Sequence, residues 1–183
     1  MACAHLERWQ AHLRRVRAAY QQANRPHGTH PVATLTVFTY NWPWSAAATV
    51  FDAWQHWMQH APDELWSNCL LLTNNDKAGE PMARVNGVYV GGAGPVPAML
   101  QKLVSNIGVA PSSSVIAPNN ILDTMLIEAG CFQKTVAECH QPGQNPQGQV
   151  ARDTSNAKSD YFTSLLPSPA IHALVNAISE RQA

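Results

Sequence analysis

The chain has 183 residues, of which 45% are hydrophobic, so it is long enough and apolar enough to fold around a sizeable core. Its 12 basic and 12 acidic residues give a formal net charge of zero, which argues against nucleic acid or an anionic membrane as a partner. No apolar run reaches the roughly 20 residues of a membrane-spanning helix, and the N-terminus lacks the apolar core of a signal peptide. As written, we expect a cytoplasmic chain.

The first half of the chain predicts a strand, a helix and a hairpin. Residues 34–42 are β-branched and aromatic, whereas 45–60 repeat apolar residues at helical spacing behind Ser45, a typical N-cap. Residues 65–73 and 83–90 read as two strands, and the turn formers between them favour an antiparallel pairing.

The following residues complete a recognisable order of elements. The turn GGAGP at 91–95 leads into a helical stripe that ends at Gly108, and 112–118 form a short strand. The order β-α-β-β-α-β predicts an α+β fold with a ferredoxin-like core, in which both helices cover one face of an antiparallel sheet. A further strand at 158–166 and a helix from Ser168 extend this core.

Five of the six tryptophans lie between residues 39 and 69. Trp54 and Trp57 fall on the predicted helix and are interpreted as core residues against the sheet. In the first strand, alternation separates aliphatic side chains from aromatic and polar-tipped ones. We interpret the second set as the uncovered face of the sheet, which meets solvent, a ligand or another domain. This set comprises Thr34, Thr36, Phe38, Tyr40 and Trp42.

Five stretches, taken in order, carry a family resemblance. They are residues 37–68, VNGVYVGG at 85–92, AGC at 129–131, ECH at 138–140 and AKSDYFTSLLPSP at 157–169. Together they resemble the substrate domain of FAD-linked oxidases of the berberine-bridge-enzyme type, in particular the bacterial members.

This resemblance implies a fold, a cofactor and a partner. In that family a sheet backed by helices roofs an FAD that a separate flavin-binding domain holds, and a small substrate such as a sugar, an alkaloid or a polyketide-like ring is oxidised with oxygen as the electron acceptor. The flavin-binding domain, with its glycine-rich phosphate loop, and the family's usual base and flavin-side tyrosine have no counterpart in the sequence. We therefore expect an inactive fragment: a partial substrate domain at 30–183 behind an atypical amphipathic segment at 1–29, with no catalytic, FAD-binding or metal residue of its own.

Four polar residues on the predicted strands are the candidates for contact with a substrate. They are Tyr40, Asn68, Asn86 and Tyr161. Each is expected to direct a hydroxyl or amide group toward the cavity under the roof.

Other patterns offer weaker chemistry. His56 and His60 have the i,i+4 spacing of metal ligands, but an adjacent glutamate and a third ligand are missing. The GGAGP turn lacks the third glycine of a dinucleotide-binding loop and the lysine of a P-loop. For Cys131 and Cys139 we favour a local disulfide, which would suit a secreted relative, and a pair of reduced buried thiols stays an open alternative.

A function of another class remains open, namely a non-catalytic ferredoxin-like binding or dimerisation module. Its uncovered sheet face would pair with a second copy, giving a homo-oligomer. A discrete dimer in solution would indicate this module, whereas an exposed aromatic face would indicate the severed substrate domain.

Overall fold

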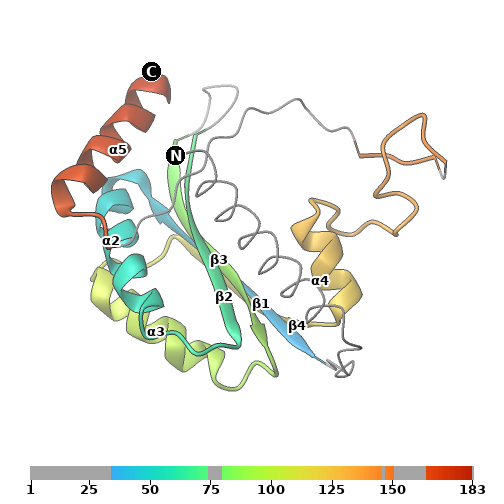
Figure 1. Ribbon diagram of the computed structural model, residues 1–183, viewed down its shortest axis with the longest axis horizontal. Coiled ribbons are helices and arrows are strands. Elements are labelled where there is room, and N and C mark those ends of the chain that lie inside the picture. The colour runs from blue at the N-terminus through green and yellow to red at the C-terminus, as the bar shows by residue number, and fades with distance from the viewer. Residues whose placement is uncertain (1–33, 74–79, 146, 151–163, 183) are drawn as a thin grey trace, which may run out of the picture. The chain divides into compact units, whose positions relative to one another are not determined.

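The computed structural model describes residues 34–73, 80–145, 147–150 and 164–182. The chain divides into Met1–Pro31 and Val32–Ala183, and every described residue lies in the second unit. In this described part, four strands form one antiparallel sheet in the order β2-β3-β1-β4 (Figure 1). The strands are β1 (Leu35–Pro43), β2 (Leu65–Leu72), β3 (Met82–Val90) and β4 (Ser113–Asn119).

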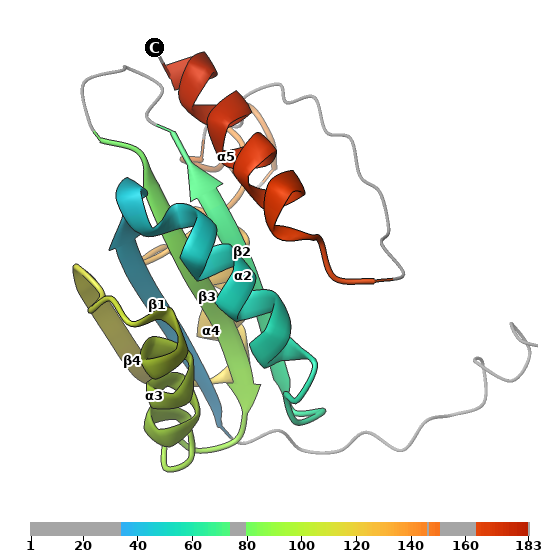
Figure 2. The ribbon, with the colours of Figure 1, turned by 90° about the vertical axis from the view of Figure 1, so that its left-hand side faces the viewer.

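Helices lie on both sides of this sheet. Figures 1 and 2 show α4 on one side and the other three described helices on the opposite side. The helices are α2 (Ala47–Met58), α3 (Val96–Ile107), α4 (Ile121–Glu128) and α5 (Ser168–Gln182). We call the sheet face under α2 and α3 the near face and the opposite one the far face. The predicted α+β fold and the β-α-β-β-α-β order are thereby confirmed.

The hydrophobic core lies between the near face and the helices α2 and α3. Trp42 and Phe38 are its largest fully buried side chains, and Trp54 and Trp57 are half-buried against it. Helix α3 contributes residues of the predicted apolar stripe to this core. The helix is followed by Gly108, which adopts the left-handed conformation (φ 71°). The α3 residues are Val96, Leu100, Leu103 and Ile107.

The face assignment predicted for β1 is wrong. Thr36, Phe38 and Trp42 are buried on the near face, and the aliphatic residues of β1 lie on the far face. The polar groups of Thr36 and Trp42 can be buried because each donates a hydrogen bond to a backbone carbonyl oxygen next to the sheet. The Thr36 hydroxyl donates to the Gly91 carbonyl oxygen (2.8 Å), and the Trp42 indole Nε1 donates to that of Val109 (2.9 Å).

The N-terminus of α2 also differs from its prediction. Ser45 is not an N-cap but an exposed residue of a 3-10 turn, η1 (Trp44–Ala46), and the actual N-cap, Ala46, makes no side-chain hydrogen bond. The Ala47 N–H donates to the Trp44 carbonyl oxygen inside this turn. One of the first N–H groups of α2 therefore has a backbone partner and needs no capping side chain.

An amide side chain attaches the segment before α5 to α2. Buried Gln55 donates from Nε2 to the Leu166 carbonyl oxygen and accepts from the Leu166 N–H, both at 2.9 Å. The predicted strand at 158–166 is not present at Ser164–Leu166, and its remainder lies outside the described residues. The predicted helix from Ser168 is α5. No helix in the described ranges is long and apolar enough to cross a membrane.

Candidate functional site: a polar cluster on the far face

Two asparagines face each other on neighbouring strands of the far face. The β2–β3 register pairs Asn68 with Asn86, and directly paired residues of antiparallel strands project to the same side. The Oδ1 atoms of both side chains are buried and have no hydrogen-bond partner in the structure. An unsatisfied buried acceptor costs about 1–3 kcal/mol, so such a pair calls for a ligand or water that donates hydrogen bonds.

The structure brings together two of the four predicted site residues. Asn68 and Asn86 share the far face as expected, because alternation along the β2–β3 hairpin was interpreted correctly. Tyr40 instead lies on the near face, where its ring packs against Trp42 with 5.9 Å between the centroids. Grouping Tyr40 with the asparagines was therefore incorrect. Tyr161 lies outside the described residues.

Three further polar residues of the same face were not among the predicted substrate contacts. Arg84 donates from Nε to the Asn41 Oδ1 (2.8 Å), and the Asn41 Nδ2 donates to the Ser113 hydroxyl (2.8 Å). The register of β1 with β3 and β4 places all three residues side by side on the far face. Arg84 is two residues before Asn86 on β3. One signal was available in the sequence, since Arg84 stands two positions before Asn86 and must share its side of the strand.

The turn at 91–95 connects β3 to α3. Gly91 (φ 147°) uses its carbonyl oxygen to accept the Thr36 hydroxyl, and added Cβ atoms at Gly92 and Gly94 would meet nothing within 4 Å. A dinucleotide-binding loop has a third glycine and a P-loop has a lysine, and this turn has neither. The sequence of this turn therefore does not match a phosphate-binding loop.

The two histidines considered as metal ligands line a groove between α2 and α3. His56 and His60 share it with residues that include Trp57 and Lys102, and its volume is about 390 Å³. His56 Nδ1 lies 2.8 Å from the Asp52 carbonyl oxygen. Among the described residues, no group of three histidine, cysteine, aspartate or glutamate side chains is placed to hold a metal ion.

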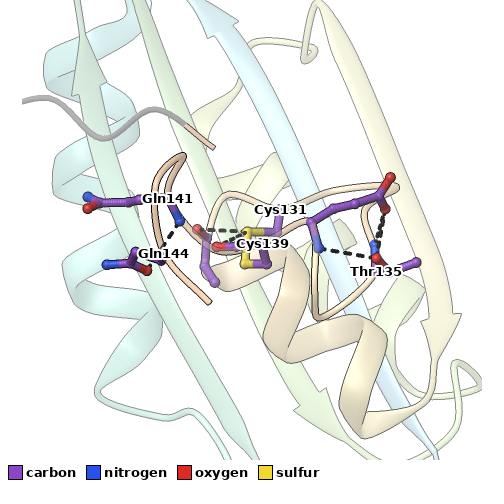
Figure 3. Close-up of a disulfide and its surroundings, with 7 residues drawn as sticks. Cys131, Thr135, Cys139, Gln141 and Gln144 are labelled. Atoms are coloured by element: carbon purple, nitrogen blue, oxygen red, sulfur yellow. Dashed lines mark hydrogen bonds between the residues drawn. A yellow bond between two sulfur atoms is a disulfide. The ribbon is translucent and has the colours of Figure 1, made fainter. Parts of the chain in front are cut away.

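A disulfide closes the loop that follows α4. Cys131 and Cys139 are bonded, with 5.5 Å between their Cα atoms (Figure 3), so the favoured interpretation of these cysteines is confirmed. Cys69 is a free thiol on the near face, and burial raises its pKa to about 12. The thiol therefore stays protonated near neutral pH, and we assign it no nucleophilic role.

Glu138 predicts a pH dependence within this disulfide loop. Its carboxylate accepts from the Thr135 N–H and hydroxyl (both 2.8 Å), and these bonds hold its pKa below the ordinary value of 4.5. A lowered pKa in the folded state means that the stabilisation is complete above the ordinary pKa and is lost as pH falls through the lowered one. We expect the Thr135 amide resonance to titrate by NMR with a midpoint below 4.5. The Glu138→Gln variant should abolish this titration, and a wild-type midpoint at or above 4.5 would contradict the assignment.

Comparison with known proteins supports the fold but offers no match in sequence. No protein-family model and no curated protein matches the chain. Among solved structures, BBE-like 1 of Physcomitrella patens aligns with 82% of this chain at a TM-score of 0.57 and 16% identity. BBE-like #28 from Arabidopsis thaliana aligns with 79% at a TM-score of 0.55 and 18% identity. The Bermuda grass isoallergen BG60 aligns with 80% at a TM-score of 0.55 and 15% identity.

The alignments also give the extent of the likeness within the larger proteins. This chain spans 31% of the length of BBE-like 1 and 28% of the lengths of BBE-like #28 and BG60. At such identities a structural likeness establishes the fold. The chain thus has the fold of one part of the BBE-like (berberine-bridge-enzyme-like) proteins, which is the resemblance that the sequence predicts.

Proposed function

We propose that this chain is the substrate-facing part of an FAD-linked oxidoreductase, with its far face as one wall of the cavity in which a small organic molecule is oxidised. The observation that carries this proposal is the Asn68 and Asn86 pair, whose Oδ1 atoms are buried on one sheet face without a hydrogen-bond partner. The fold shared with BBE-like proteins supports it further.

The division of labour follows from the chemistry of the described residues. FAD, when bound, accepts the electrons of the substrate and passes them to oxygen. The residues at 91–95 lack the third glycine and the lysine of phosphate-binding loops, so in this proposal another domain holds the cofactor. This chain contributes two amide acceptors that orient the hydroxyl or amine donors of a substrate, and a sheet that keeps them in position. The proposal assigns no proton transfer to any described residue.

Trp66 offers a spectroscopic test of the isolated full chain. It lies on the far face next to Asn68 and is 48% exposed, so FAD or a small ligand that reaches this face should quench its fluorescence. We expect a monomer by size exclusion whose tryptophan emission is quenched at high FAD concentration, without stoichiometric binding. The Trp66→Phe variant should lose this quenching, whereas Trp57→Phe, on the helical side, should retain it.

Two results would overturn the proposal. Tight stoichiometric FAD binding with production of hydrogen peroxide would show that the chain holds its own cofactor. A discrete dimer in which Trp66 is protected from acrylamide quenching would favour the alternative function, a dimerisation module that uses the far face as its interface.

A further inference from the structure

A hydrogen-bonded row of side chains on the far face fixes the orientation of Arg84. The Asn41 Oδ1 accepts a hydrogen bond from the arginine Nε–H, and the Asn41 Nδ2 donates one to the Ser113 hydroxyl, each with a length of 2.8 Å. These two bonds together determine the orientation of the Asn41 amide. The row runs from β3 across β1 to β4. Because a guanidinium group is planar, fixing Nε also fixes the plane in which the two Nη groups lie.

The Nη end of this arginine has one weak side-chain contact within the part of the chain that the structure describes. Among the described residues its nearest partner is the Met82 sulfur, 3.8 Å from Nη2, and this is a weak contact. No strand residue that projects to the far face is acidic, so within the sheet no carboxylate neutralises the charge of Arg84. Arg84 is half-buried, which strengthens its attraction for an anion relative to a fully solvated arginine.

The asparagine pair lies beside this cation. Asn86 is two residues from Arg84 on β3, which corresponds to about 7 Å along a strand. A bound molecule therefore meets one cationic fork and, a short distance away, two acceptors that need donors. Inorganic phosphate satisfies the arginine but is too small to reach both amide oxygens across about 7 Å, and an ammonium ion satisfies the oxygens but is repelled by the arginine.

We infer that the far face binds a hydroxylated carboxylic acid, with its carboxylate on the Nη groups of Arg84 and its hydroxyl groups donating to Asn68 and Asn86. This inference rests on the proposed function in taking the far face as the substrate side, and it adds the chemical class of the substrate. Asn41 is a positioning residue, since it acts on the ligand only by holding Arg84.

Matched probes test the chemical class by calorimetric titration of the full chain. Glucuronate and glucose differ by the carboxylate alone, and propionate carries a carboxylate without hydroxyl groups. A charge-assisted pair of hydrogen bonds contributes enough for about a tenfold gain in affinity. We expect glucuronate to bind at least about tenfold more tightly than glucose or propionate, and inorganic phosphate to bind no better than propionate.

Variants test the assigned residues. Arg84→Gln should weaken glucuronate binding about tenfold or more and leave glucose binding unchanged, and Arg84→Lys should recover part of the loss. Asn86→Leu should weaken both sugars. Lys102→Gln removes the same charge from the exposed side of α3 and should change neither affinity. Far-ultraviolet circular dichroism should show that each variant is folded.

The inference fails if glucuronate binds no better than glucose, if phosphate binds as tightly as glucuronate, or if Arg84→Gln and Lys102→Gln behave alike. None of these measurements involves flavin. If glucuronate binds as expected but FAD does not quench Trp66, this site is retained and the proposed oxidoreductase is overturned. If FAD quenches Trp66 but binding does not depend on the carboxylate, the substrate class alone is overturned.

Discussion

Replacing Gly87 with alanine is expected to destabilise the fold by about 3 kcal/mol, although alanine normally suits a strand better than glycine does. A Cβ atom at this position would clash with the backbone oxygen of Trp66 and lie 2.6 Å from Cζ of Phe38. The first clash is with the backbone of β2, which cannot rotate away, and the second is with a ring that is fully buried in the core. The available space therefore decides the sign of the effect.

Gly94→Ala is the matched control, because an added Cβ there would meet nothing within 4 Å. We expect it to change the free energy of unfolding by less than about 0.5 kcal/mol, as is usual for exposed positions. Urea unfolding followed by circular dichroism would measure both variants. If Gly87→Ala proved as stable as Gly94→Ala, the close approach of β2 to the Phe38 ring would be refuted.

The order of elements was predictable because each has a strong local pattern. The stripe from Val96 to Ile107 has helical periodicity, and the alternation around Asn68 and Asn86 fixes the sides of β2 and β3 once the two strands pair as a hairpin. The short helix α4 was not predicted. Its start does carry a local signal, since the Asn120 side chain accepts from the Asp123 N–H at 2.8 Å.

The face of β1 could not be predicted from the strand itself. Polar tips on Thr36 and Trp42 favour a solvent-facing side, but their partners, Gly91 and Val109, are 55 and 67 residues away in the sequence. The same limit applies to the candidate site. Alternation places Arg84 beside Asn86, whereas its fixed orientation depends on Asn41, 43 residues earlier on a strand whose register only the tertiary structure supplies.

The second large effect is expected at Trp42. Its indole is fully buried at the end of β1, and its N–H donates to the Val109 carbonyl oxygen in the connection between α3 and β4. Trp42→Ala leaves a cavity the size of the largest side chain in the core and should lower the free energy of unfolding by about 3–5 kcal/mol. Trp42→Phe keeps much of the packing and loses the hydrogen bond, so we expect about 1–2 kcal/mol.

Trp66 provides the comparison that makes this prediction a test of the whole face assignment. It carries the same side chain on β2 of the same sheet, but it projects to the far face and is 48% exposed. Trp66→Ala should therefore cost less than about 1 kcal/mol in thermal or urea unfolding. If the aromatic side of β1 formed the uncovered face, Trp42→Ala would be the mild substitution. A larger loss at Trp66 than at Trp42 would thus reverse the two faces and remove the asparagine pair from the substrate side.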